Sequence, residues 1–372
     1  MAVLFWVFAG VAVYVYLGYP ILVSVLAGLF SKPVKKAAVT PSVSLLIAAY
    51  NEAHVIEQKI RNSLALDYPP ESLEIVIASD GSTDGTAELA SRFVDGHRVR
   101  VLVFPRNRGK ISVLNDSVPQ LRGAIVAFSD ASSMLAPEAL RLLVESFADP
   151  EVGGVSGVYK VRKQEQAHIG ASEDFYWKYE TFLKRQEGRL GSILGGHGSL
   201  YAIRKELYSF PPLNTINDDY VIALRVVQQG YRMAYEPRSI ACEEAIEMSG
   251  FSRRVRINTG NVKQLREMKA LLWPPRWLAL FFFLSHKAGR VVVPACMLGA
   301  LVTNALLLDR PGFVVLALVQ AAFYLLAIAG AFYRLKPKAF RLPYYFSMIN
   351  AAAFLAVFFA LIGRRQIVWK RQ

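Results

Sequence analysis

Acidic side chains stand at three places along the chain where chemistry could be done. Asp80 and Asp84 lie in SDGSTDGT, Asp130 lies in FSDAS, and the pair Asp218 and Asp219 lies in NDDY. Carboxylates can ligate Mg²⁺ or Mn²⁺ and can accept the proton of an attacking hydroxyl group. The set therefore predicts metal-assisted chemistry on a substrate that carries a nucleoside diphosphate.

Each of these residues also has an ordinary structural explanation. Asp80 and Asp84 can form an Asx turn and cap a helix, and Asp130 can cap a turn. Asp218 and Asp219 precede a helical pattern, where negative charge favours the helix N-terminus. Their occurrence together and in order favours the functional interpretation. The sequence has no P-loop and no serine–histidine–acid or cysteine–histidine pattern.

The elements that must position these residues alternate between strands and helices. Near-continuous runs of Val, Ile and Leu end in polar clusters, which is typical of parallel strands covered on both faces. The predicted strands are 43–52, 73–82, 99–107 and 124–132, and the helical patterns between them are 54–66, 86–94 and 110–118. This alternation predicts a doubly wound α/β sheet, which binds ligands beyond the carboxyl ends of its strands.

A second set of elements follows the predicted sheet. Residues 172–189 form an aromatic-rich amphipathic pattern, in which Trp177 and Tyr179 are expected to pack the helix. The glycine-rich stretch after it contains Gly196 and His197, which are candidates for a contact with a sugar. A polar loop residue that stabilises its own backbone is the alternative for His197.

Apolar segments enclose this α/β region. Residues 3–30 carry no charge and are long enough to cross a hydrocarbon layer of about 30 Å. They lack the basic start of a cleaved signal peptide, so residues 1–31 are predicted to be a retained transmembrane anchor. Lys32, Lys35 and Lys36 follow, which predicts a cytoplasmic location for the next domain.

The C-terminal part is predicted to return to the membrane. Residues 251–290 form a basic, amphipathic interfacial segment, and 278–284 is read as part of it. The apolar runs that approach the length of a span lie within 291–364, at 291–308, 313–333 and 344–362. Three spans would place the basic tail, 365–372, outside, against the positive-inside tendency. The sequence therefore leaves the number of spans open.

The net charge of +14 and the hydrophobic share of 53% narrow the choice of partners. The positive charge suits the flanks of membrane spans and a surface that attracts anionic lipid and nucleotide diphosphate. Nucleic acid is not expected, because the basic residues cluster beside apolar segments. Cys242 and Cys296 form neither a disulfide framework nor a zinc-binding spacing.

Taken in order, the motifs resemble glycosyltransferase family 2. The resemblance rests on AAYNE, SDGSTDGT, Gly109-Lys110, FSDAS, GGHGSLYAIR, NDDY and RRVR, and it covers about residues 40–300. It is strongest to the membrane-anchored branch that includes cellulose, hyaluronan and poly-N-acetylglucosamine synthases and exopolysaccharide transferases. The resemblance implies a GT-A fold for residues 38–250 and an inverting single displacement at the anomeric carbon.

The resemblance also implies roles for individual residues. Asp219, with Asp218 before it, matches the catalytic base, and Asp130 with Ser132 matches the motif that binds Mg²⁺ or Mn²⁺. The positions that match donor-binding residues are Ala49, Tyr50, Glu52, Asp80, Lys110, Asp130 and Arg256.

Three departures from the family pattern are informative. The metal motif reads Asp130-Ala131-Ser132, so its second carboxylate is missing and a weaker ligand replaces it. The base element is Asp218-Asp219 where the family has Glu-Asp, which is a mild change. Ile257 follows Arg256 where processive synthases carry a tryptophan that stacks on the acceptor sugar. This change favours a non-processive enzyme.

The leading hypothesis is an inverting glycosyltransferase that moves one sugar from a nucleotide diphosphate sugar, with UDP as the expected nucleotide. The expected acceptor is lipid-linked, either a polyprenyl-diphosphate oligosaccharide or a glycolipid, and reaches the enzyme from the membrane. One alternative is a processive polysaccharide synthase that exports its polymer. A second alternative is an inactive scaffold that binds nucleotide sugar.

Overall fold

The computed structural model describes residues 1–162, 170–244, 250–265, 269–273, 276–333 and 338–362. They divide into two compact units. The sheet unit comprises residues 29–164 and 177–245, and the helical unit comprises 1–28, 165–176 and 246–366, less the residues outside the described ranges. The predicted basic tail, 365–372, lies outside the described residues.

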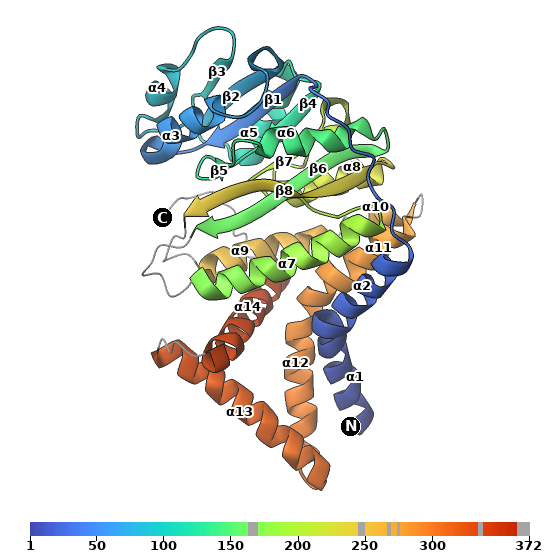
Figure 1. The fold of residues 1–372 in the computed structure, drawn as a ribbon. Helices are drawn as coiled ribbons and strands as arrows, with labels where there is room; N and C mark the ends of the chain where they lie inside the picture. Colours follow the sequence, from blue (N-terminus) through green and yellow to red (C-terminus); the bar gives the residue numbers. More distant parts are fainter. Residues whose placement is uncertain (163–169, 245–249, 266–268, 274–275, 334–337, 363–372) are drawn as a thin grey trace. The chain divides into compact units, whose positions relative to one another are not determined.

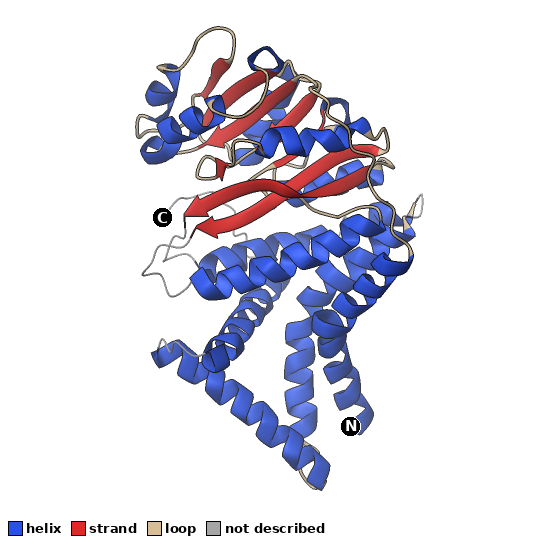
Figure 2. Ribbon diagram, in the orientation of Figure 1, coloured by secondary structure: helices blue, strands red, loops and turns tan. Residues whose placement is uncertain are grey.

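The sheet unit contains one mixed sheet (Figures 1 and 2). Its strand order is β3-β2-β1-β4-β7-β6-β8-β5. The strands are β1 Val43–Ala49, β2 Leu73–Asp80, β3 Val99–Phe104, β4 Ile125–Phe128, β5 Met134–Leu135, β6 Val152–Arg162, β7 Tyr201–Arg204 and β8 Arg232–Glu244. Strands β3, β2, β1 and β4 are parallel, whereas β7 is antiparallel to both β4 and β6. The predicted α/β fold with a mostly parallel sheet is therefore confirmed.

Helices connect the strands and cover the sheet. They are α3 Ala53–Leu64, α4 Thr86–Ser91, α5 Lys110–Ser117, α6 Ala139–Val144, α7 Gly170–Leu190 and α8 Asp218–Gln228. The predicted helices begin and end close to these bounds. The chain passes from strand to helix to strand through β1, α3, β2, α4 and β3, as expected for a doubly wound sheet.

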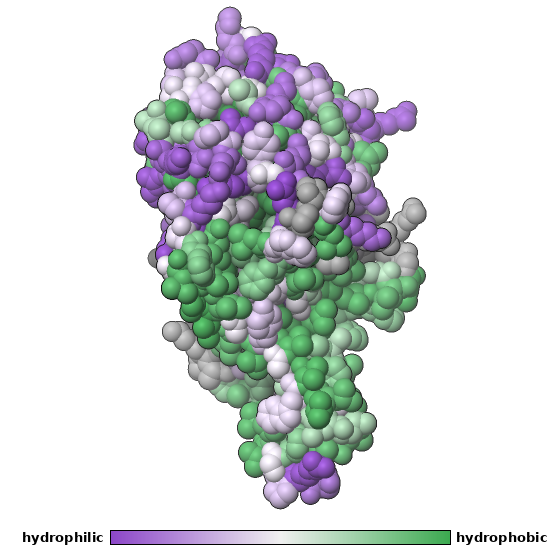
Figure 3. Space-filling model, turned by 90° about the vertical axis from the view of Figure 1, so that its right-hand side faces the viewer, coloured by the Kyte–Doolittle hydropathy of each residue, from purple (hydrophilic) through white to green (hydrophobic). Residues whose placement is uncertain are grey.

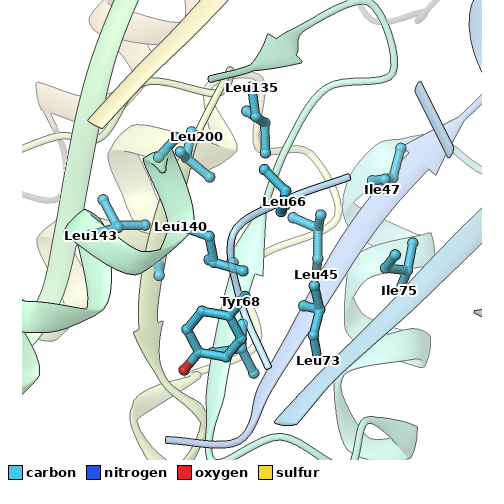
Figure 4. Packing of buried hydrophobic residues seen from close by; sticks show 14 of the residues in the cluster. Leu45, Ile47, Leu66, Tyr68, Leu73, Ile75, Leu135, Leu140, Leu143 and Leu200 are labelled. Carbon is cyan, nitrogen blue, oxygen red and sulfur yellow. The ribbon is translucent and has the colours of Figure 1, made fainter. Parts of the chain in front are cut away.

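The central strands of the sheet unit do not alternate between apolar and polar residues, because the core surrounds them. All residues of β1 and β2 are buried, because helices cover both faces of the sheet. Figure 4 shows Leu45 and Ile47 of β1 beside Ile75 of β2, with Leu140 and Leu143 of α6 in the same cluster. Full burial of one such side chain contributes about 1.5–3 kcal/mol.

The helical unit consists of long apolar helices and the shorter α9–α11 segments. Its elements are α1 Ala2–Val13, α2 Tyr19–Leu29, α9 Gly250–Gln264, α10 Lys269–Leu272, α11 Trp277–Phe282, α12 Gly289–Ala305, α13 Pro311–Tyr333 and α14 Lys338–Leu361. Within the described residues, four helical stretches are long and apolar enough to span a membrane: Ala2–Leu29, Trp277–Ala305, Pro311–Phe332 and Phe340–Leu361. Figure 3 shows hydrophobic side chains over the surface of these helices.

Residues 278–290, predicted to be interfacial, belong to a helical stretch that runs from Trp277 to Ala305. Their position relative to the membrane stays a prediction. A π-helical turn, Phe283–Ala288, joins α11 to α12 and buries Ser285 and His286. The Ser285 hydroxyl also lies 2.8 Å from the hydroxyl of Tyr14. Two polar residues are thereby accommodated inside the helical unit.

The turn after β2 gives a first testable prediction. Gly81 has a φ of +65°, and a Cβ there would lie 2.4 Å from the carbonyl carbon of Arg106. Replacing Gly81 by Ala should lower the free energy of unfolding by about 2–4 kcal/mol through backbone strain and overpacking. The measurement is the melting temperature of the detergent-solubilised chain, followed by tryptophan fluorescence.

Gly85→Ala is the matched control. Gly85 has a φ of +89°, but a Cβ there meets nothing within 4 Å. Only the conformational cost of about 1–2 kcal/mol should appear. Equal melting temperatures for the two variants would contradict close packing of this turn on the 106–107 backbone.

Candidate functional site

The carboxyl ends of β1 and β2 carry two loops that hydrogen bonds join. The Asn51 side-chain oxygen accepts from the Thr83 N–H at 2.9 Å, and the Asn51 N–H donates to the Ser82 hydroxyl at 3.1 Å. The Glu52 N–H donates to the Thr86 hydroxyl at 2.8 Å. Asn51 has a φ of +55°, an unusual value that these bonds hold in place. The loop after β1 is therefore rigidly attached to the loop after β2.

Three predicted nucleotide contacts lie on this edge. Ala49 is buried in the core. Tyr50 and Glu52 follow directly and are partly exposed. The structure brings these positions to the sheet edge, and their contact with a nucleotide stays a prediction.

Asp80 positions the neighbouring loop. It is 0% exposed, and its two carboxylate oxygens accept from the backbone N–H groups of Arg108 and Gly109 at 2.9 and 2.8 Å. Because Lys110 opens α5 directly after this loop, Asp80 determines where the Lys110 side chain starts. A contact between Asp80 and a nucleotide stays a prediction. Asp84, in contrast, accepts from the Ala53 and Thr86 N–H groups, as its structural explanation anticipated.

Lys110 connects two of the predicted acidic positions. Its ammonium nitrogen lies 2.8 Å from Asp130 Oδ1 and 3.1 Å from Asp218 Oδ2. Burial lowers the pKa of Lys110, but the charges of Asp130 and Asp218 outweigh this effect and raise the pKa above its usual range. The side chain of Asp130 is 42% exposed, so this carboxylate remains accessible to a ligand.

Asp219 lies close to Asp130 and is connected to it through Gly198. Its Oδ2 accepts from the Gly198 N–H at 3.1 Å, while the Gly198 carbonyl accepts from the Asp130 N–H at 3.2 Å. Gly198 thus links Asp219 to Asp130. Burial and the charge of Asp218 raise the pKa of Asp219 to about 6, although Lys184 and Lys110 oppose the shift. A half-buried carboxylate with this pKa is ionised at neutral pH and is a competent proton acceptor.

The predicted sugar contacts lie in the adjoining loop. The Gly196 N–H donates to the main-chain oxygen of Asp219 at 3.0 Å, and its carbonyl accepts from Lys184 at 2.9 Å. His197 is 5% exposed, and its ring packs edge-on against Trp177 with the centroids 5.6 Å apart. Trp177 therefore packs within the unit as expected. A sugar contact of Gly196 or His197 stays a prediction.

Sequence reasoning missed Lys59, which lies beneath the site. It is fully buried, and its ammonium group donates to the Ser129 hydroxyl at 2.7 Å and to the Ser133 carbonyl. Burial lowers the pKa of Lys59 to about 7, while the charges of Asp130 and Glu243 oppose the shift. The available signal was a lysine within the buried stripe of α3, between Ile56 and Ser63.

The predicted metal position fits a hard divalent cation. Asp130 offers an accessible carboxylate, and the absence of a side chain at Gly198 leaves space, since a Cβ there would lie 3.0 Å from Asp130 Oδ2. The Ser132 hydroxyl donates to Glu243 Oε1 at 2.5 Å. Oxygen donors of this kind suit Mg²⁺ or Mn²⁺ when substrate phosphates complete the coordination. Among the described residues, no group of three His, Cys, Asp or Glu side chains is arranged to hold a metal alone.

Arg256 lies on α9, in the helical unit, and is exposed. Arg254, two residues earlier, is buried and donates to the Tyr345 hydroxyl at 2.8 Å, which attaches α9 to α14. Arg256 belongs to the helical unit, and its contact with a diphosphate stays a prediction.

Comparison with solved structures identifies the fold of this mixed sheet. The fold is that of a GT-A glycosyltransferase: a mannosyltransferase from Pyrobaculum calidifontis, solved in complex with GDP-Man and Mn²⁺, superposes with a TM-score of 0.75. The two chains are 24% identical, and the match covers 96% of this chain and 100% of that one.

Sequence comparison finds a match to one family model. Residues 44–209 match the model described as Glycosyl transferase family 2. Outside the matched residues, the apolar helices fit a membrane-anchored protein.

Two curated relatives carry the same name, poly-beta-1,6-N-acetyl-D-glucosamine synthase. The protein from Staphylococcus epidermidis is 26% identical over 280 residues, which are 72% of this chain and 66% of that protein. The protein from Staphylococcus aureus strain COL is 29% identical over 199 residues, which are 52% of this chain and 48% of that protein. The chain thus spans just under two thirds of the first relative and about half of the second.

Removing the Lys110 ammonium tests the electrostatic link in the site. Lys110→Met should lower the free energy of unfolding by about 1–3 kcal/mol, because Asp130 and Asp218 then face each other without their shared cation. Partial exposure of Asp130 keeps the expected loss below that of a fully buried pair. The measurement is the shift in denaturation midpoint of the solubilised protein.

A double-mutant cycle with Asp218→Asn supplies the control. The double variant should recover part of the loss, since the two carboxylates no longer repel each other. Strictly additive losses in the double variant would contradict the bridging role of Lys110.

Proposed function

We propose that the protein is an inverting glycosyltransferase that moves a sugar from a nucleoside diphosphate sugar to a lipid-linked acceptor. The expected donor is UDP-linked, and the acceptor is a polyprenyl-diphosphate oligosaccharide or a glycolipid. The observation that carries the proposal is the convergence of Asp130, Lys110 and Asp219 at one edge of the sheet.

Asp219 is proposed as the general base. The acceptor hydroxyl must lose its proton as it attacks the anomeric carbon, and a positioned carboxylate accelerates such a step about 10²–10⁴-fold. The Gly198 N–H holds Asp219 Oδ2, and the raised pKa of Asp219, about 6, makes it a stronger base than an ordinary aspartate. Attack on one face and departure of the nucleotide from the other inverts the anomeric configuration.

Asp130, Lys110 and Arg256 are proposed to receive the donor diphosphate. A bound Mg²⁺ or Mn²⁺ would neutralise the charge that develops on the leaving diphosphate. Asp130 would hold that ion, and the Lys110 ammonium, 2.8 Å from Asp130, would add a second positive group. The Mn²⁺ in the Pyrobaculum calidifontis mannosyltransferase supports a metal in this fold. Arg256, on α9, is the proposed third cation.

The helical unit supports an acceptor that comes from the membrane. Four candidate spans surround the sheet unit in sequence, and the basic helix α9 precedes three of them. Basic amphipathic helices attract anionic lipid headgroups. Lys32, Lys35 and Lys36 favour a catalytic domain on the cytoplasmic side. Ile257, which cannot stack on a sugar ring, favours a single addition.

A processive synthase is the second candidate. Likeness to proteins named poly-beta-1,6-N-acetyl-D-glucosamine synthase favours it, at 26% and 29% identity. Both candidates use the same base and donor site, and they differ in what happens to the product after one transfer.

Replacing the proposed base gives a direct prediction. Asp219→Asn should reduce transfer about 10²–10⁴-fold, because an amide cannot accept the proton, while nucleotide affinity should stay nearly unchanged. The rate of the unmodified enzyme should fall about tenfold per pH unit below about pH 6, where Asp219 becomes protonated. The measurements are initial rates with radiolabelled nucleotide sugars and membrane lipid extract, beside nucleotide binding by calorimetry.

Asp116→Asn is the matched control. Asp116 carries an exposed ion pair with Arg108 and does not contact the proposed base. Its rate and its pH profile should match those of the unmodified enzyme. Retained transfer in Asp219→Asn would remove this residue from the role of base.

Product length separates the two candidates. Single addition predicts one discrete glycolipid that is extractable into organic solvent and does not lengthen with time. The measurement is gel and thin-layer analysis of the radiolabelled product over a time course. A water-soluble ladder that grows with donor concentration would contradict the lipid-linked proposal and support the synthase.

A further inference from the structure

Ser132 occupies the position at which the family's metal motif has its second carboxylate, and in this chain it meets a carboxylate from another strand. The Ser132 hydroxyl donates to Glu243 Oε1 at 2.5 Å. The register of β5 on β8 explains the meeting, because Met134 pairs with Cys242 and Leu135 with Ala241 in antiparallel order. The chain just before β5 therefore runs alongside the end of β8, where Glu243 lies.

The other oxygen of Glu243 is held as well. The Tyr159 hydroxyl donates to Glu243 Oε2 at 2.8 Å, and Glu243 pairs with Val161 in the parallel ladder between β6 and β8. The Tyr159 ring packs edge-on against Trp177, with the centroids 4.7 Å apart. The backbone and both oxygens of Glu243 are thus positioned by surrounding structure.

Lys59 lies close to both Glu243 and Asp130 and interacts with the charge of each. Its buried ammonium group interacts with the charges of both carboxylates, and it donates to Ser129 and Ser133 on either side of the Asp130–Ser132 turn. Asp130 and Glu243 therefore both lie close to one buried lysine, with the Ser132 hydroxyl bound to Glu243.

We propose that Glu243 supplies the second carboxylate of the metal site, in place of the one that is missing at Ser132. The inference rests on the proposed function, since it concerns the divalent cation of the same site. One aspartate with a neutral hydroxyl is a weak ligand set, whereas two carboxylates with substrate phosphates suit Mg²⁺ or Mn²⁺. Ser132 and Tyr159 act as positioning residues that orient the Glu243 carboxylate through its two oxygens.

Manganese binding by the full chain in detergent tests the inference. The probes are Mn²⁺ alone and Mn²⁺ with UDP or GDP, and the readout is free Mn²⁺ measured by electron paramagnetic resonance. Glu243→Gln should weaken Mn²⁺ binding at least tenfold, as should Asp130→Asn. Asp116→Asn is the matched control and should bind Mn²⁺ as the unmodified chain does.

Moving the carboxylate to the family's usual position should rescue binding. The double variant Ser132→Asp with Glu243→Gln restores two carboxylates, so its Mn²⁺ affinity should return to within about threefold of the original, because the charge of the ligand set is restored. A purely structural role for Glu243 predicts no rescue.

A measurement on the unmodified chain covers the case in which a Glu243 variant fails to fold. Growth with ¹³C-carboxyl glutamate should give electron–nuclear double resonance couplings from a glutamate carboxylate bound to Mn²⁺. Absence of these couplings, or unchanged affinity in Glu243→Gln beside a loss in Asp130→Asn, would overturn the inference and leave the proposed function intact. Absence of any Mn²⁺ binding with either nucleotide would contradict both the inference and the metal in the proposed function.

Discussion

Carboxylates of like charge cannot share a small volume without a cation, and this constraint organises the sheet edge. Asp130 follows β4, whereas Asp218 and Asp219 open α8, and the Lys110 ammonium bridges the first two. Asp80 fixes the loop that delivers Lys110, and Gly198 links Asp130 to Asp219 through its backbone. A donor diphosphate with its metal ion would enter a site whose charged groups are already held in place. Preorganisation of this kind is the largest contribution that many enzymes make to lowering a barrier.

Much of the fold could be predicted because its signals are local. The runs that became β1 and β2 are continuously apolar, which follows from burial on both faces, and the uncharged N-terminal segment could only be a long apolar helix. The antiparallel insertion of β7 between β4 and β6 depends on pairing between residues far apart in sequence. Such pairing cannot be predicted from the short-range periodicity of apolar residues. The sequence also did not predict that a π-helical turn buries His286 without ending the helix.

Some residues of the candidate site could likewise be predicted from local motifs, and others could not. Asp130, Lys110 and Asp219 could be predicted because each belongs to a motif, and the structure brings them together. There was only a weak indication of Lys59 in the sequence, where it is a lysine on the apolar stripe of a helix. There was no indication of Glu243, because the position of this residue beside Ser132 depends on the register of β5 on β8. In the sequence, Ser132 is a weaker ligand in place of the second carboxylate of the metal motif. In three dimensions its hydroxyl meets a carboxylate from a strand more than a hundred residues away.

The central claim is that one diphosphate binds where Asp130, Lys110 and Asp219 converge. A cryo-electron microscopy structure of the chain in lipid nanodiscs, with UDP and Mn²⁺ added, tests this claim most directly. The account predicts density for a metal ion against Asp130, with the diphosphate near Lys110 and the Asp219 carboxylate facing the open side of the terminal phosphate. Nucleotide density in another cavity, away from these three residues, would contradict it.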